Sequence, residues 1–113
     1  HAGRLFVSFN SLSQIACIDP VSGRTLFKTN TAKQPRTICL SKDQRYLFVT
    51  CYESNKLQVF QVNKNSFSLL YSLDCPGKPI GLDLYEDKDC LEAWVCTYEE
   101  DNLKIYTFSK IEI

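Results

Sequence analysis

The sequence contains no methionine, one tryptophan and a single histidine, which is its first residue. Because no histidine follows His1, a Ser-His-acid hydrolase site contained within the chain is excluded, and the Gly-x-Ser-x-Gly nucleophile elbow is also missing. No Cys-x-x-Cys pair occurs, so we expect neither a metal site nor a bound cofactor. The missing initiator methionine suggests a processed or excised piece of a longer polypeptide, or one whose leader was removed.

An excess of charge of one sign is also lacking. The chain has thirteen basic and thirteen acidic side chains, and no block of either sign stands out. The one-signed electrostatic field of a nucleic-acid binder or of an acidic-membrane binder is therefore not expected. No apolar run approaches the roughly 18 residues of a membrane-spanning helix. The composition predicts neither a nucleic-acid partner nor a membrane partner.

The six cysteines favour free thiols over disulfides. Cys17, Cys39, Cys51 and Cys96 lie inside strand-like apolar runs, where a thiol packs as a small hydrophobic side chain. Free thiols are typical of a reducing compartment, so we expect a cytoplasmic protein. For Cys75 and Cys90 the sequence leaves the disulfide state open.

A repeated apolar segment indicates the fold class. Leu5-Phe6-Val7-Ser8 lies 42 residues before Leu47-Phe48-Val49-Thr50, and Ala93-Trp94-Val95-Cys96 lies 46 residues after it. A repeat of this length, built from strand-sized runs without a helical pattern, is typical of a β-propeller blade of four antiparallel strands. Because propellers have about four to eight blades, residues 1–113 supply only about two and a half, which is an incomplete ring.

The strands are expected in three cycles, at about residues 4–40, 46–84 and 91–108. Pro20-Val21-Ser22-Gly23 is a strong turn signal between two of them, and prolines at positions 35 and 79 mark the connections between blades. The last cycle stops at a third strand, because the tail from Ser109 is too short for a fourth. We therefore expect the closing, C-terminal portion of a larger propeller, with the remaining blades on a preceding segment or on another chain. The predicted strands are 4–9, 14–19, 24–29, 36–40, 46–51, 56–62, 67–73, 80–84, 91–97 and 102–108.

The central cycle carries a family resemblance. The segment from Pro35 to Thr50, followed by Glu53-Ser54-Asn55-Lys56-Leu57-Gln58-Val59-Phe60, resembles the YVTN-type repeats of seven-bladed propellers of the lactonase-like branch. Ile18-Asp19 at the end of a strand fits the same pattern. The last cycle departs from it in the longer acidic turn from Tyr85 to Cys90. Neither a Gly-His nor a Trp-Asp pair is present, so a WD-repeat protein is a weaker match.

In a propeller, the connections between blades and those between second and third strands share one face, which usually carries the site. Arg36 is the sharpest candidate there, since its guanidinium at the start of an inner strand could bind a carboxylate or phosphate. The alternative is that Arg36 pairs with a loop acid or a backbone carbonyl, and Lys78 has the same two readings. The candidate ligand- or partner-binding residues are Arg36, Lys78, Lys33, Gln34, Tyr52, Glu53, Asn55, Tyr98, Glu99 and Asp101.

None of these residues is predicted to be catalytic. Glu99-Glu100-Asp101 could help to bind a cation, but a solvated hairpin tip is the simpler interpretation. Glu53 would act in acid–base catalysis only if a buried neighbour tuned it, and no spacing requires this.

Two functions follow as hypotheses. The first is a non-enzymatic interaction scaffold, in which loops on one propeller face dock a protein partner. The second, implied by the family resemblance, is a lactonase-like or isomerase-like enzyme with a charged central-channel site shared with blades outside this chain. In that enzyme Arg36 would be the electrostatic anchor. We favour the scaffold, because a fold alone does not specify catalysis.

Overall fold

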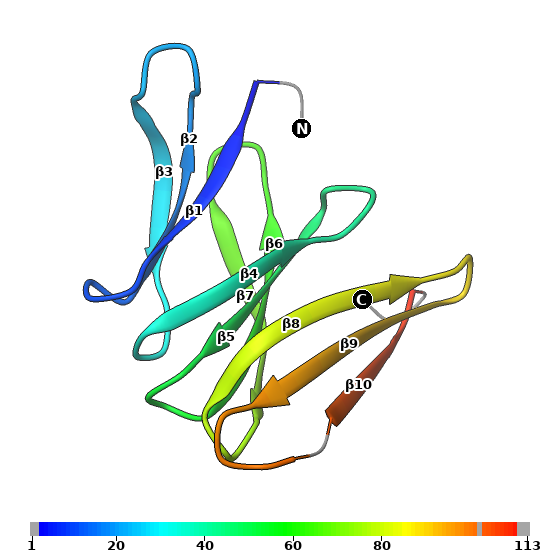
Figure 1. The fold of residues 1–113 in the computed structure, drawn as a ribbon. Coiled ribbons are helices and arrows are strands. Elements are labelled where there is room, and N and C mark those ends of the chain that lie inside the picture. The colour runs from blue at the N-terminus through cyan, green and yellow to red at the C-terminus, as the bar shows by residue number, and fades with distance from the viewer. Residues whose placement is uncertain (1–2, 102, 111–113) are drawn as a thin grey trace.

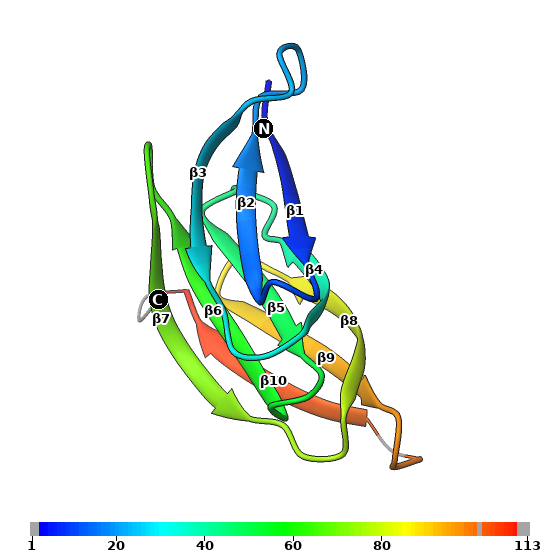
Figure 2. The ribbon, with the colours of Figure 1, turned by 90° about the vertical axis from the view of Figure 1, so that its left-hand side faces the viewer.

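The structure, a computed structural model, describes residues 3–101 and 103–110, and that part of the chain forms ten strands and no helix. The strands pair antiparallel in three sheets, in the order β1-β2-β3, β4-β5-β6-β7 and β8-β9-β10. Figures 1 and 2 show the sheets fanned side by side. The predicted all-β class and blade-like sheets are confirmed. The strands are β1 (Leu5–Phe9), β2 (Gln14–Ile18), β3 (Thr25–Asn30), β4 (Pro35–Leu40), β5 (Tyr46–Cys51), β6 (Lys56–Val62), β7 (Phe67–Asp74), β8 (Pro79–Glu86), β9 (Cys90–Thr97) and β10 (Leu103–Ser109).

The proline connections belong partly to the strands. Pro35 and Pro79, which the sequence placed in the links between blades, are the first residues of β4 and β8. Proline fits there because it has no N–H to donate to a ladder and is tolerated at the start of a strand. The strand register shifts directly after each proline, between Pro35 and Thr37 and between Pro79 and Gly81. Both inner strands therefore begin with the same irregularity.

Two turns are set by aspartates. Asp19, expected in a strand, instead follows β2 and accepts hydrogen bonds from the Val21 N–H at 3.0 Å and the Ser22 hydroxyl at 2.9 Å, which hold its pKa below the usual range. Asp87 likewise accepts from the N–H groups of Asp89 and Cys90, which lower its pKa. The acidic turn predicted from Tyr85 to Cys90 is thereby shortened to residues 87–89. Position 102, predicted to begin the last strand, lies outside the described residues.

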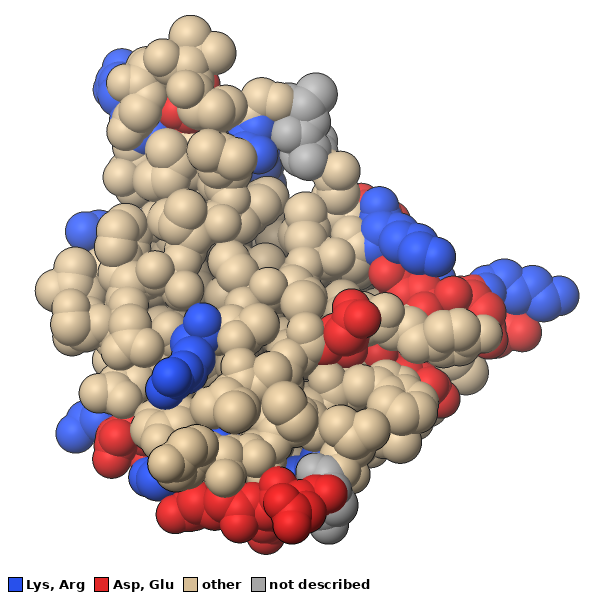
Figure 3. Space-filling view, in the orientation of Figure 1, with Lys and Arg blue, Asp and Glu red and all other residues tan. Residues whose placement is uncertain are grey.

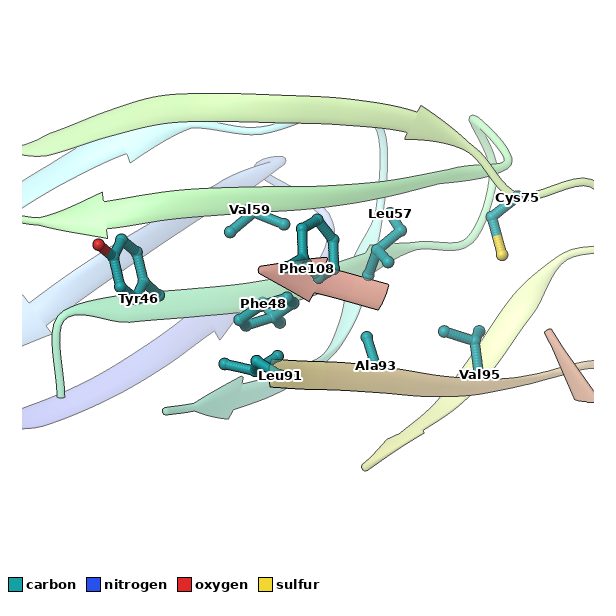
Figure 4. Packing of buried hydrophobic residues seen from close by; sticks show 9 residues of the cluster. All are labelled: Tyr46, Phe48, Leu57, Val59, Cys75, Leu91, Ala93, Val95 and Phe108. Atoms are coloured by element: carbon teal, nitrogen blue, oxygen red, sulfur yellow. The ribbon is translucent and has the colours of Figure 1, made fainter. Parts of the chain in front are cut away.

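The central strand β5 is buried along its whole length. All six of its residues are buried, so both faces of the middle sheet are covered by other sheets. On one side Leu47 and Val49 pack with Ile15 of the first sheet. On the other side Phe48 packs with Leu91, Ala93 and other residues of the third sheet (Figure 4). Phe48 and Phe108 meet edge to face with ring centroids 5.5 Å apart.

The three sheets form an open arc rather than a ring. Contacts between sheets join neighbours in the arc, through β1 with β4 and through β4 with β8. The outward faces of the first and third sheets carry exposed apolar side chains, among them Leu5, Leu26, Trp94 and Leu103. Other blades are needed to complete a ring. The expected place of these sheets at the C-terminal end of that ring stays a prediction.

Packing between sheets should dominate stability. Leu57 is fully buried between the second and third sheets, whereas Leu12 is 65% exposed in a turn. Leu57→Ala is expected to lower the free energy of unfolding by about 2–5 kcal/mol, because it removes buried methyl groups and leaves a cavity. Leu12→Ala, the matched control, should change it by less than about 0.5 kcal/mol. Urea denaturation of both variants measures the difference, and equal losses would contradict the packing described here.

Candidate functional site

Five connections lie on one face of the arc and are called here the loop face. They comprise residues 10–13, 31–34, 52–55, 75–78 and 98–101, and they run along the lower left edge of Figure 1. Backbone hydrogen bonds join them across neighbouring blades. The turns at 19–24, 41–45, 63–66 and 87–89 lie at the other ends of the strands. The loop face therefore brings together the segments that carry the predicted site residues.

Asn55 fastens one connection between blades. Its φ of 55° places it in the left-handed region, which asparagine tolerates. Its backbone carbonyl accepts the N–H of Cys75 at 2.9 Å, and its side-chain Oδ1 accepts the N–H of Lys78 at 2.9 Å. The carbonyl of Lys78 in turn accepts the N–H of Tyr98 at 2.8 Å. Asn55 and Lys78 thus tie the 52–55 turn, the 75–78 connection and the end of β9 together.

Ser13 fastens the preceding connection in the same way. Its φ is 54°, its carbonyl accepts the N–H of Thr31 at 2.8 Å, and its hydroxyl accepts the N–H of Gln34 at 3.2 Å. The carbonyl of Gln34 accepts the N–H of Tyr52 at 2.9 Å. Gln34 and Lys78, both proposed as binding residues, share a positive φ and serve the backbone in equivalent ways. The repeat is therefore built from conformation and hydrogen bonding as well as from strands.

The Tyr52 ring is the centre of a charged and aromatic group, called here the Tyr52 cluster: Arg36, Tyr52, Glu53, Lys78 and Tyr98. The Arg36 guanidinium carbon lies 4.7 Å from the Tyr52 ring centroid, and Lys78 Nζ lies 5.6 Å from the same centroid. Lys78 Nζ also lies 3.6 Å from Glu53 Oε1. The rings of Tyr52 and Tyr98 meet edge to face with centroids 6.5 Å apart. A cation from the inner strand β4 and a cation from the 75–78 connection, which leads into the next inner strand, therefore share one aromatic ring.

The composition of the cluster suits an anionic group. Arg36 is exposed, and its guanidinium packs over a ring face, which leaves its planar set of donors available to a carboxylate or phosphate. Lys78 adds a second positive charge on the same ring, partly offset by Glu53. Of the two interpretations of Lys78, pairing with a loop acid is what the structure shows. Arg36 stacks on Tyr52 instead.

The remaining predicted residues lie around the cluster. Lys33 is exposed and its carbonyl accepts the Ser54 hydroxyl at 3.2 Å. Glu99 is exposed and donates its N–H to the carbonyl of Gly77 at 2.9 Å. Asp101 is exposed on the same turn, where the neighbouring Glu100 forms an ion pair with Lys104 at 2.7 Å. The structure therefore brings together five of the ten predicted residues, gives Gln34 and Asn55 structural roles, and leaves Lys33, Glu99 and Asp101 at the rim.

Within residues 3–101 and 103–110, no group of three His, Cys, Asp or Glu side chains is placed to hold a metal ion. All six cysteines carry free thiols. Burial raises the pKa of Cys51 to about 12 and raises the pKa of Cys39 and Cys75 as well, so these three thiols stay protonated near neutral pH. No helix able to cross a membrane is found among the described residues.

Sequence reasoning missed two features of the loop face. It did not single out Ser13, although Ser13 lies 42 residues before Asn55, the spacing of the first repeat. It also missed the close approach of the 75–78 connection to β9, where a Cβ on Gly77 would lie 3.0 Å from Thr97 Oγ1. The positive φ of 99° at Gly77 adds a second reason for glycine.

Comparison with protein families places this geometry in context. The model of a family described as lactonase, 7-bladed β-propeller, matches residues 10–73. That match covers the first three connections of the loop face and reaches Leu73 in β7, the last strand of the middle sheet. A comparison with curated proteins finds no match.

Similar solved structures share the fold. A protein from Lactobacillus plantarum is 24% identical with a TM-score of 0.82, over 96% of this chain and 35% of that one. A functionally unknown protein from Desulfotomaculum acetoxidans is 12% identical with a TM-score of 0.76, over 94% of this chain and 33% of that one. Hydrazine synthase from Kuenenia stuttgartiensis is 17% identical with a TM-score of 0.71, over 95% and 31%. The chain thus spans about a third of the length of these structures.

Substitutions at Asn55 test the fastening of the loop face. Asn55→Asp keeps an acceptor for the Lys78 N–H and should leave the free energy of unfolding nearly unchanged. Asn55→Gly keeps the backbone conformation but leaves that N–H unpaired, at an expected cost of about 1 kcal/mol. Asn55→Ala loses the acceptor and places an unfavourable side chain at positive φ, at about 2–3 kcal/mol. Chemical denaturation gives the order, and an alanine variant as stable as the aspartate variant would contradict this role.

Proposed function

The chain belongs to the lactonase family of seven-bladed β-propellers, and we propose on that premise that it serves as a non-enzymatic interaction scaffold whose loop face docks a protein partner. The observation that carries the proposal is the placement of Arg36 and Lys78 on one tyrosine ring. Arginine and tyrosine are enriched among the residues that contribute most to binding at protein interfaces.

The Tyr52 cluster has the composition of an interface centre. Tyr52 is partly buried between neighbours, while Arg36 and Tyr98 are exposed around it. Because the Asn55 and Ser13 fastenings fix the backbone of this face, the connections that carry the cluster are already ordered before a partner binds. Pre-ordering lowers the entropy lost on association. The partner that fits presents a carboxylate to Arg36 and an apolar surface to the tyrosines.

We also propose that the protein works in a reducing compartment, as expected for the cytoplasm. The support is the set of six free thiols, three of which have no exposed surface: Cys17, Cys51 and Cys75. Thiols of this kind act as small core side chains and need no oxidising environment.

A lactonase-like or isomerase-like enzyme is the second candidate, and family membership favours it. In that case Arg36 would hold an anionic substrate group by electrostatic attraction, and the reacting groups would come from blades outside this chain. The Arg36 guanidinium serves both functions. The two candidates differ in whether it binds a carboxylate of a protein partner or an anionic group of a substrate.

A cross-linking experiment separates the two candidates. A photoreactive benzoylphenylalanine in place of Tyr98, which is exposed at the rim of the cluster, should capture a defined protein partner in cells. Arg36→Ala should lower the yield by about thirtyfold, because a central arginine contributes about 2 kcal/mol to binding. Arg36→Lys should give an intermediate yield, because it keeps the charge but loses the planar donors.

Arg24→Ala is the matched control, since Arg24 is exposed in a turn at the other end of the strands. Its yield should equal that of the wild type. A yield that Arg36→Ala leaves unchanged would overturn the scaffold proposal. Turnover of a panel of lactones that Arg36→Ala abolishes and Arg24→Ala spares would instead establish the enzyme.

A further inference from the structure

The outward face of the third sheet carries an open groove that the loop face does not involve. The groove has a volume of about 730 Å³ and lies across β8, β9 and the start of β10. Trp94, Cys96 and Leu103 contribute to its wall, and Asp83 and Glu92 are its acidic members. Gly81 lets the sulfur of Cys96 lie over the inner strand at the floor of the groove, because a Cβ there would lie 2.5 Å from that sulfur.

The groove is built like a face that another sheet covers. In the middle sheet Phe48 pairs with Val59, and 46 residues later Trp94 pairs with Ile105 in the same register. Phe48 and Val59 are fully buried under the third sheet, whereas Trp94 is 37% and Ile105 49% exposed. Equivalent positions thus carry large apolar side chains in both sheets, but among the described residues only Phe48 and Val59 are covered by another sheet.

The chemistry of the inner strand differs between these two faces. In β4 the Thr37 hydroxyl donates to the Ile80 carbonyl at 2.6 Å, and the Cys39 thiol donates to the Leu82 carbonyl at 3.4 Å. These two donors connect the inner strands of the second and third sheets. They fix how β4 contacts the neighbouring blade.

In β8 the equivalent positions hold Gly81 and Asp83. Gly81 pairs with Cys96 and Asp83 with Trp94, as Thr37 and Cys39 pair with Thr50 and Phe48. Glycine has no side-chain donor, and an ionised carboxylate only accepts hydrogen bonds. An inner strand that fits against β8 therefore presents hydrogen-bond donors to Asp83. In contrast, β8 itself presents carbonyl acceptors to β4.

The third sheet is also acidic, although the chain as a whole is neutral. Residues 79–109, which span β8, β9, β10 and the turns between them, contain eight acidic side chains and two basic ones. Figure 3 shows acidic side chains along the lower edge and, together with Lys or Arg side chains, along the right-hand edge, where Figure 1 has the turns at each end of β9. Glu92 accepts a hydrogen bond from the Trp94 indole N–H at 3.0 Å, and Asp83 accepts the N–H of Leu84 at 2.9 Å. Carboxylates that become covered by a neighbour need a compensating charge.

We propose that the groove docks another blade of the same propeller ring, and that this blade places an arginine or lysine against Asp83 and Glu92. The occupant is a blade because the chain belongs to a seven-bladed family and spans about a third of similar structures. We infer the cation because Gly81 and Asp83 occupy the positions in β8 that the donors Thr37 and Cys39 occupy in β4. The proposal does not depend on what the loop face binds.

The thiol of Cys96 reports whether the groove is covered, because Cys96 lines it and is the exposed member of the six cysteines. In the complete propeller, labelling by a thiol reagent, followed by mass spectrometry, should be at least tenfold slower at Cys96 than in the denatured protein. Asp83→Lys should raise the labelling rate at Cys96 at least tenfold by repelling the cation. Asp89→Lys makes the same charge change in the exposed turn at residues 87–89 and should leave the rate unchanged.

Buried Cys75 is the internal reference for folding. If Asp83→Lys also exposes Cys75, the fold has been lost, and the milder Asp83→Asn decides, with an expected two- to fivefold increase at Cys96 alone. Rapid labelling of Cys96 in the wild type would overturn the docking. Protection that persists in Asp83→Asn and in folded Asp83→Lys would overturn the cation, and oxidative cross-linking of Cys96 between two copies of this chain would overturn the choice of occupant.

Discussion

The structure depends on the packing of sheets against each other on both faces. β5 shows the constraint most clearly, since all six of its residues are buried between two other sheets. A sheet of this kind has no solvent face and cannot be stable by itself, because each large apolar side chain left in water forgoes roughly 1.5–3 kcal/mol. The exposed apolar residues on the first and third sheets therefore lie on faces of the same kind that no other described sheet covers.

The loop face inherits its order from that packing. Arg36 lies in β4, and Tyr52 lies in the turn between β5 and β6 of the same blade. Lys78 belongs to the connection into the next blade. The distances of 4.7 and 5.6 Å to one ring hold only if both blades keep their relative position. Asn55 accepts hydrogen bonds from the N–H groups of Cys75 and Lys78, which fix the 52–55 turn to the 75–78 connection. A binding site of this kind is a property of two neighbouring sheets.

The sequence predicted the strands well because apolar runs of strand length repeat at nearly constant spacing. Turn boundaries were predicted less well, since Asp19 and Asp87 shorten strands or turns through side-chain hydrogen bonds that spacing does not reveal. Of the candidate site, residue types and a common face followed from the sequence, but the stacking of Arg36 on Tyr52 depends on the offset between a strand and a turn. The acidic third sheet was overlooked, because the balanced total charge conceals it.

Polar side chains that differ from one blade face to the next can determine which blades lie next to each other in a ring. If every interface used the donors found at Thr37 and Cys39, neighbouring blades would be interchangeable as far as the inner strands are concerned. Asp83 breaks this equivalence, because a blade that offers carbonyl oxygens to it leaves a covered carboxylate without a partner. Specificity then comes from the penalty on wrong neighbours as much as from the attraction of the right one. A repeat protein with similar apolar cores can in this way keep a fixed order of blades through a few polar positions.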